Sequence, residues 1–304
     1  MRPGAATVLD RLSQGAKVAV IRLRSLGDCV LTTPALALLK QHRPDLKIAV
    51  VVENRFRRVF EQSPDVAIVL GPSLSAIAGF HPAMVINFHG GTRSQWIVAA
   101  SLAGIRAGFG HHMGSWLYNV PIPRAQQILG EERIVHTAEH MASAMFFLGV
   151  PRRQIPRARL VCRELPGRKP YAVIHPMAST ASKAWPASRF AEIARRLHDL
   201  EPVFIGGPGE DLSSFSDFEC HAGAPLETIF SLMHSASLFI GNDSGPAHIA
   251  AAFGVPSVVL FGPSNPCIWA PWQTRSEVVH SPQGLGLIPV DRVWIAVEKL
   301  RASA

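Results

Sequence analysis

Short apolar runs alternate with longer segments of mixed polarity along most of the chain. The first run, residues 17–23, has the near-continuous hydrophobicity of a buried strand, and a loop at 24–28 leads from it into a helical pattern that reaches about residue 40. Thr33-Pro34 lies inside that pattern, where we expect a break or restart with Thr33 as the cap. The rest of the first half predicts strands at 48–52, 66–70 and 85–88 and helices at 55–62, from 89–93 onward and at 131–148.

The alternation starts again after residues 149–170, where prolines lie among arginines as in a connection between domains. The second half predicts strands at 171–175, 203–207, 237–240 and 255–261 and helices at 186–200, 226–236, 245–253 and 291–301. Strands that alternate with helices indicate parallel sheets with both faces covered. We therefore expect an α/β protein with two doubly wound, Rossmann-like domains facing a cleft, whose ligands bind beyond the carboxyl ends of the strands.

The segment Gly241–Gly254, GNDSGPAHIAAAFG, joins two of the predicted strands through a helix of small residues. Pro246 suits the first helical turn, Asp243 or Ser244 suits the N-cap, and Gly254 ends the helix. The turn therefore offers unpaired N–H groups and the positive end of a helix dipole to an anion, most often a phosphate. The alternative is an ordinary strand-to-helix turn with a capping Asp.

Two more loops of the second half offer groups for the same kind of ligand. Residues Ser179–Lys183, with Thr180 among them, provide hydroxyls and an ammonium, and Gly206–Asp211 provides close backbone approach and carboxylates for ribose hydroxyls. Singly, each loop could be a turn, a solvated lysine or a helix cap. Together they predict a nucleoside diphosphate site. The sequence contains no P-loop pattern, and no G-x-G-x-x-G follows the first strand, which disfavours a dinucleotide.

In the first half, Asp28 is the candidate for chemistry. It follows Ser25-Leu26-Gly27 at a strand-to-helix junction, where a carboxylate could accept a proton from an attacking hydroxyl. The alternative is that Asp28 only caps its helix.

Composition limits the class of protein. A chain of 304 residues with 48% hydrophobic and 17% charged residues is globular and long enough for two domains. It has no run of membrane-spanning length and no signal-peptide core, so we expect a cytoplasmic protein with its four cysteines as free thiols. The histidines lack metal-ligand spacing, and we predict no metal site and no cofactor.

The basic residues are concentrated in the first half. Residues 1–160 contain 19 Lys and Arg against 9 Asp and Glu, whereas the rest contains 11 against 13. This half could face a phosphorylated glycolipid, a membrane surface or nucleic acid, or could only keep the protein soluble. No basic motif interleaved with aromatic residues supports nucleic acid, which we do not expect as a partner.

Two motifs give the chain a family resemblance. Residues 22–28, RLRSLGD, with 31–36, LTTPAL, resemble the opening of the ADP-heptose:lipopolysaccharide heptosyltransferases, glycosyltransferase family 9. Residues 241–252 followed by Gly262-Pro263-Ser264 resemble the sugar-nucleotide motif of that family, and 183–186, KAWP, match its middle loop. Residues 73–124 resemble the family little, which leaves the acceptor open.

The resemblance implies a GT-B fold with defined parts. These are an acceptor domain at 1–160, a linker at 161–170, a donor domain at 171–290 and a last helix at 291–304 that packs back on the first domain. It also implies inverting, metal-independent transfer of a heptose from ADP-heptose to an inner-core lipopolysaccharide, with peripheral contact at the cytoplasmic face of the inner membrane. Two other classes stay open: a GT-B isomerase of the sugar nucleotide, and a nucleotide-sugar-binding protein without activity.

The family's functional residues match particular positions of this chain. Asp28 matches the catalytic carboxylate and Lys183 the phosphate-binding lysine, which would act with the N–H groups of Ser244 and Gly245 on the departing diphosphate. The expected donor-binding residues are Thr180, Lys183, Asp211, Asp243, Ser244, Gly245 and His248. The expected acceptor-binding residues are Arg24, Arg55, Arg58 and Arg93.

Overall fold

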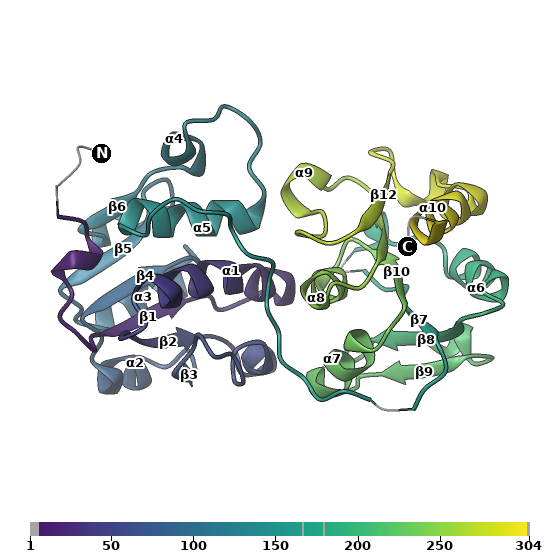
Figure 1. Cartoon of the computed structure of the whole chain (residues 1–304), viewed down its shortest axis with the longest axis horizontal. Helices are drawn as coiled ribbons and strands as arrows, with labels where there is room; N and C mark the ends of the chain where they lie inside the picture. The colour runs from purple at the N-terminus through teal and green to yellow at the C-terminus, as the bar shows by residue number, and fades with distance from the viewer. Residues whose placement is uncertain (1–5, 166, 179, 303–304) are drawn as a thin grey trace. The chain divides into compact units, whose positions relative to one another are not determined.

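The chain divides into two compact units, Met1–Pro156 and Arg157–Ala304 (Figure 1). The computed structural model describes residues 6–165, 167–178 and 180–302. The first unit ends a few residues before the boundary at 160 that we expected. It also contains the basic excess, with 17 Lys and Arg against 9 Asp and Glu, while the second unit has 13 of each.

The first unit is built on a six-stranded parallel sheet in the order β3-β2-β1-β4-β5-β6. Its strands are β1 (Lys17–Ile21), β2 (Lys47–Val51), β3 (Ile68–Leu70), β4 (Met84–Asn87), β5 (Ile105–Phe109) and β6 (Val120–Ile122). Its α-helices are α1 (Leu26–His42), α2 (Leu74–Phe80), α3 (Thr92–Ala100), α4 (Ala125–Leu129) and α5 (Thr137–Leu148). Short 3-10 helices are η1 (Leu9–Arg11), η2 (Asn54–Val59) and η3 (Ser115–Leu117). The order reverses between β1 and β4, which is the switch point where doubly wound sheets bind ligands.

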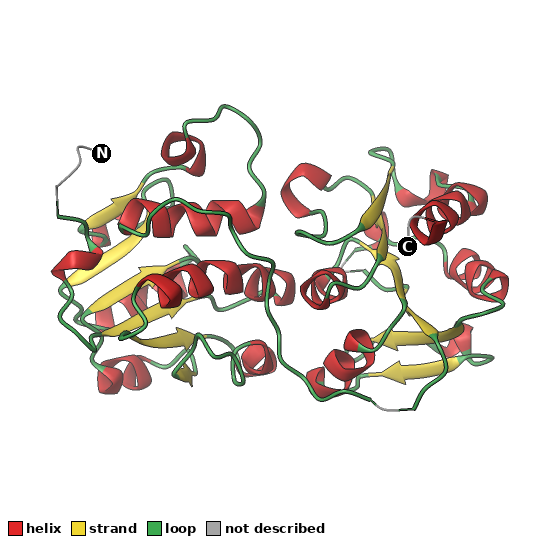
Figure 2. Cartoon of the chain, in the orientation of Figure 1, coloured by secondary structure: helices red, strands yellow, loops and turns green. Residues whose placement is uncertain are grey.

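Apolar side chains cover both faces of this sheet. The central strand β1 is buried from Val18 onward, as expected of a parallel strand with helices on either side (Figure 2). Helices α1 and α5 pack against each other, while Ile97 of α3 and the half-buried Leu117 of η3 close a separate core over β1 and β4. Burying one such side chain contributes about 1.5–3 kcal/mol, so these layers hold the helices against the sheet.

Helix α1 runs through Pro34 without the break that we expected. Proline lacks the N–H that would bond the carbonyl of Val30 four residues earlier. The hydroxyl of Thr33 donates to that carbonyl instead, at 2.8 Å. A local side-chain hydrogen bond therefore replaces the missing backbone bond, and Thr33 is an interior residue rather than a cap.

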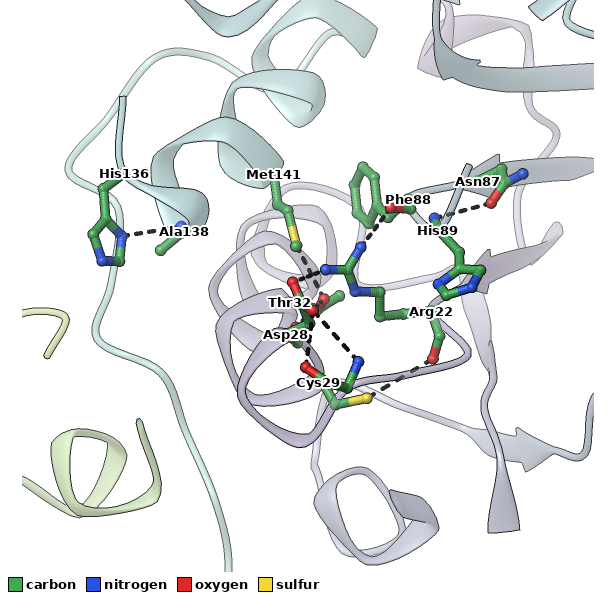
Figure 3. A network of polar contacts seen from close by, with 11 residues as sticks. Arg22, Asp28, Cys29, Thr32, Asn87, Phe88, His89, His136, Ala138 and Met141 are labelled. Atoms are coloured by element: carbon green, nitrogen blue, oxygen red, sulfur yellow. Dashed lines mark hydrogen bonds and ion pairs between the residues drawn. The ribbon is translucent and has the colours of Figure 1, made fainter. Parts of the chain in front are cut away.

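Helix α5 begins at Thr137, later than the pattern at 131–148 suggested. His136 forms the cap: its Nδ1 accepts from the N–H of Ala138 at 3.1 Å (Figure 3), and the Glu139 carboxylate accepts from the N–H of His136 at 3.1 Å. This reciprocal capping box fixes the start of the helix.

The second unit repeats the topology of the first. Its sheet has the order β12-β11-β10-β7-β8-β9. From β9 to β12, the strands follow one another as third, second, first, fourth, fifth and sixth of their unit, which is the order of the first sheet. The strands are β7 (Tyr171–His175), β8 (Glu201–Gly206), β9 (Glu219–Ala222), β10 (Leu238–Asn242), β11 (Ser257–Phe261) and β12 (Ser276–His280). The α-helices are α6 (Ala187–Arg196), α7 (Leu226–His234), α8 (Gly245–Phe253), α9 (Pro266–Trp269) and α10 (Val290–Ala302), with 3-10 helices η4 (Ala181–Lys183), η5 (Ser213–Phe215) and η6 (Leu285–Leu287). Here the switch point lies between β7 and β10.

The last helix packs within the second unit, and the contact with the first domain that we expected of residues 291–304 stays a prediction. Helix α10 buries Val293, Val297 and Leu300 in the core of the second unit, against β11, β12 and α6. Its apolar positions recur three and four residues apart and match this neighbouring core, so the structure assigns the helix to the second unit. Within residues 6–165, 167–178 and 180–302, none of the helices combines the length and apolarity needed to cross a membrane.

Candidate active site

Asp28 lies at the switch point of the first unit, in the first turn of α1 directly after β1. Its Oδ2 accepts from the hydroxyl of Ser25 at 3.0 Å and from the Ser25 N–H at 3.4 Å. Ser25 is therefore the N-cap, and Asp28 is the N3 residue of a capping box at the start of α1. Its second oxygen, Oδ1, is engaged elsewhere.

Arg22 holds that second oxygen. Its guanidinium donates to Asp28 Oδ1 and, at 2.6 Å, to the carbonyl of Phe88 after β4 (Figure 3). Only 9% of Arg22 is exposed, and burial lowers its pKa to about 10, so it stays charged at neutral pH. A buried cation beside a carboxylate favours the ionised form, which is the form that can accept a proton.

Histidines surround this pair. His140 stacks on Phe109 with ring centroids 4.0 Å apart, and burial, His111, His112 and Arg22 together lower its pKa to about 4. Burial and the nearby charges of Arg22 and Arg24 lower the pKa of His89 to about 4 as well. Both imidazoles are therefore neutral at pH 7 and add no positive charge around Asp28.

Two of the four expected acceptor-binding arginines converge on one carboxylate. Arg55 and Arg93 lie 3.0 Å and 3.5 Å from oxygens of Glu53, which follows β2. Arg58 instead donates to Gln62 at 2.9 Å. Arg24 is exposed at the end of β1, in the loop before α1.

In the second unit, the switch point is bridged by a side-chain contact. The hydroxyl of Ser244, after β10, lies 3.0 Å from Nδ1 of His175, the last residue of β7. Nε2 of His175 lies 3.5 Å from a carboxylate oxygen of Glu210, whose pKa is lowered by His175 and by the N–H of Gly207. The chain thus brings three loops together around His175.

Lys183 contacts the predicted phosphate-binding turn. Its Nζ lies 3.4 Å from Oδ2 of Asp243, and about a third of its side chain remains exposed. The fully buried Asn242 fixes this loop, because its amide donates to the carbonyl of Pro176 at 2.8 Å and accepts from the N–H of Trp185 at 3.3 Å. The ammonium is therefore held beside the N-terminus of α8.

Helix α8 begins as predicted. Ser244 is its N-cap, Pro246 lies in its first turn, and Gly254 ends it with a φ of 76°. The first turn of an α-helix leaves N–H groups without partners in the helix, so Ser244 and Gly245 offer donors beside Lys183.

The remaining donor-site candidates are placed differently from one another. Thr180 lies beside Ser182, with hydroxyl oxygens 3.1 Å apart, whereas Ser179 falls outside the described residues. Asp211 is exposed and accepts from the N–H and hydroxyl of Ser213, so Glu210 is the carboxylate of this loop that reaches His175. His248 is buried in α8, beside Trp269.

Gly262, which follows β11, lies against the loop that carries Lys183. A Cβ on Gly262 would lie 3.0 Å from the carbonyl oxygen of Ser182, which is tighter than most Cβ contacts, so the glycine lets the two loops approach closely. Among the residues that the structure describes, no three His, Cys, Asp or Glu side chains gather as a metal ion would require.

Sequence comparison decides the family. The model of glycosyltransferase family 9 (heptosyltransferase) matches residues 82–285, about two thirds of the chain. The chain belongs to glycosyltransferase family 9. The match contains the whole switch point of the second unit, and it begins at residue 82, inside the segment 73–124.

Individual relatives of family 9 agree with this assignment. The chain is 26% identical to lipopolysaccharide heptosyltransferase 3 of Escherichia coli, over 93% of this chain and 98% of the relative. The crystal structure of the family 9 glycosyltransferase from Veillonella parvula superposes with a TM-score of 0.83 at 22% identity, covering 95% of this chain and 98% of its own. The structure of E. coli ADP-heptose lipopolysaccharide heptosyltransferase II superposes with a TM-score of 0.80 at 19% identity, covering 95% of this chain and 100% of its own. These structures confirm the GT-B fold class, and the chain is a glycosyltransferase.

Arg22, Glu53 and His175 are among the polar residues of these sites to which the sequence analysis gave no role, and Glu210 was considered only as one of two neighbouring carboxylates. Arg22 and His175 lie at strand ends and look like parts of buried strands in the sequence. Glu210 stands next to Asp211, and nothing in the sequence tells which of the two carboxylates turns inward.

Proposed function

We propose that the chain transfers a heptose from ADP-heptose to an inner-core lipopolysaccharide acceptor, with inversion and without a metal ion. The observation that carries the proposal is the position of Lys183, 3.4 Å from Asp243 at the N-terminus of α8. Two sources of positive charge, an ammonium and a helix N-terminus, meet there at a sheet's switch point. The E. coli relative named for ADP-heptose supports this choice of donor.

In the proposed reaction, a hydroxyl oxygen of the acceptor attacks the anomeric carbon of the heptose. The bond from that carbon to the β-phosphate oxygen breaks, and its electron pair leaves with ADP. Lys183 and the N–H groups of Ser244 and Gly245 stabilise the negative charge that develops on the diphosphate. Attack from the face opposite the leaving group inverts the anomeric centre.

Asp28 takes the proton of the attacking hydroxyl. Arg22 keeps the carboxylate ionised and oriented, while Ser25 occupies its other oxygen. We assign Asp28 as the general base and Arg22 as a positioning residue. Arg24, Arg55, Arg58 and Arg93 remain the proposed contacts of the anionic acceptor, and Thr180, Asp211, Asp243 and His248 remain proposed donor contacts.

The test is product analysis with ADP-heptose and a heptose-free inner-core acceptor. Transfer predicts equimolar ADP and a heptosylated acceptor whose anomeric configuration, read by NMR, is opposite to that of the donor. An altered sugar nucleotide formed from donor alone would instead identify an isomerase. ADP binding without turnover would identify a binding protein.

A further inference from the structure

The first unit exposes large apolar side chains on one part of its surface. Trp96, Met113 and Trp116 are 65%, 87% and 83% exposed. We call these three residues the tryptophan patch. Scattered exposed leucines need no explanation in a folded protein, but two largely exposed indoles beside a methionine mark an interaction surface.

The three side chains come from two adjoining elements. Trp96 lies on α3, and Met113 and Trp116 lie on the connection from β5 to β6 that contains η3. Gln95 joins these elements, because its amide donates to the carbonyl of Met113. Helix α3 also contacts η3 directly, so the patch is one continuous feature of the first unit.

The packing beneath the patch explains why it faces outward. Ile97 and Val98 of α3 and Tyr118 after η3 fill the core over the sheet, with Leu117 packed against it. Trp96 precedes this buried pair on the helix and is directed away from it. The core is therefore complete without the indoles, and their exposure leaves apolar area uncovered.

The charge around the patch selects the partner. Residues 66–130 contain no Asp or Glu, and their three charged side chains are Arg93, Arg106 and Arg124. Arg93 lies one turn before Trp96 on α3 and 3.5 Å from the Glu53 carboxylate, with 60% of its side chain exposed. An exposed ion pair of this kind is weak, so a lipid phosphate can replace Glu53 as the partner of Arg93. Tryptophan prefers the headgroup level of a bilayer, where its ring is apolar and its N–H is hydrated, and arginines beside it attract anionic lipids.

We propose that the tryptophan patch docks the first unit on the surface of an anionic phospholipid bilayer. The proposal rests on the proposed function in one respect: the acceptor of that reaction is itself anchored in a membrane. The indoles would insert at headgroup depth while Arg93 pairs with lipid phosphates. The unit that we assign to the acceptor would thus be held where acceptors are embedded.

The experiment measures partition of the full chain onto vesicles that contain no acceptor. The variant W96S/W116S removes both indoles, and L287S/I295S is the matched control, because those side chains are 69% and 63% exposed on the second unit. On phosphatidylglycerol vesicles, W96S/W116S should bind at least about tenfold more weakly than the unmodified chain, and L287S/I295S should bind as the unmodified chain does. Binding should weaken with salt and be weaker on phosphatidylcholine.

Vesicles with brominated acyl chains give an independent measurement. They should quench tryptophan emission of the unmodified chain, and W96S/W116S should lose that quenching. Equal partition of W96S/W116S and the unmodified chain would overturn the proposal. So would the absence of vesicle binding together with self-association that W96S/W116S abolishes, since the patch would then join two copies of the chain.

Two further measurements separate this proposal from the proposed function. Melting temperatures within a few degrees would show that both variants are folded, as surface substitutions usually are. Turnover with a detergent-dispersed acceptor should be equal in the unmodified chain and W96S/W116S. If neither the unmodified chain nor the two variants transfer heptose, but vesicle binding still depends on the indoles, the proposed function fails and the docking surface stands.

Discussion

Arg22 and Asp28 form a partly buried ion pair that ties the end of β1 to the first turn of α1. The same guanidinium also binds the carbonyl of Phe88 at the end of β4. One side chain therefore connects the two strands of the switch point with the proposed general base. This arrangement makes the chemistry of Asp28 inseparable from the packing of Arg22.

Asp28→Asn should lower kcat by at least about 100-fold while leaving the affinity for ADP unchanged, because a positioned base contributes about 10²–10⁴ in rate. Ser25→Ala is the control, since it removes a cap partner but keeps the carboxylate. It should cost about 0.5–1 kcal/mol of stability and little activity. Near-normal kcat in Asp28→Asn would reject the residue as base.

Arg22→Gln should lower both the stability of the chain and kcat. Removing the cation leaves a largely buried carboxylate without its partner, which we expect to cost about 1–3 kcal/mol in the free energy of unfolding. The pH profile of kcat should also shift, because the carboxylate would protonate more readily, whereas ADP affinity should not change. Arg22→Lys keeps the charge without the forked geometry and should restore only part of the activity. A variant with lower stability but an unchanged pH profile would assign Arg22 a structural role alone.

Lys183→Ala should weaken ADP binding by about 1.5–3 kcal/mol, the range for a hydrogen bond to a charged group. Calorimetry measures this directly. Lys169→Ala is a matched control, because that side chain is 83% exposed and lies 3.8 Å from Glu201 at the surface. Equal ADP affinity in Lys183→Ala and the unmodified chain would remove Lys183 from the donor site.

Gly262→Ala should weaken ADP binding several-fold, although the residue carries no charge. Its new Cβ would press on the carbonyl of Ser182 at 3.0 Å and displace the loop that carries Lys183. Gly286→Ala is the control, since a Cβ there meets nothing within 4 Å. If both variants bind ADP like the unmodified chain, the loop tolerates the shift and Gly262 has no part in placing the lysine.

The stability of the chain should fall as the pH drops from about 6.5 to about 4. His140 has a pKa of about 4 in the folded protein against 6.5 for an ordinary histidine. Between these values the unfolded chain binds the extra proton, so acid favours unfolding. His140→Gln should remove about 1–2 kcal/mol of this pH dependence in urea titrations, while the exposed His198→Gln should not change it. Parallel curves for His140→Gln and the unmodified chain would refute this source of acid sensitivity.

The central strands were predictable because their hydrophobicity is nearly continuous. The predictions of β1, β2, β7 and β10 agree with the structure to within a few residues. Strands nearer the sheet edges escaped notice for physical reasons: β6 is three residues long with a central proline, and β9 exposes most of its residues. A short or solvated strand is formed by its neighbours in the sheet and leaves little periodicity in the sequence.

The candidate sites likewise contain residues that a local sequence pattern indicates and residues that only long-range contacts reveal. Asp243, Ser244 and Gly245 were singled out as donor-site candidates because helix capping and anion binding require particular residue types at particular positions. The partners Arg22 and His175 were not, since a polar residue at the end of a buried strand reveals its contacts only when another part of the chain meets it. The choice between Glu210 and Asp211 likewise depends on the turn of one loop.

The repeated strand order of the two sheets has an evolutionary consequence. The core around β1 and β4 is made within the first unit, and the core around Trp185 and α10 is made within the second. A recombination event near Pro156 would therefore exchange one complete half without rebuilding the interior of the other. Under the proposed function, such an exchange would replace the half that we assign to the acceptor and keep the half that we assign to the sugar nucleotide.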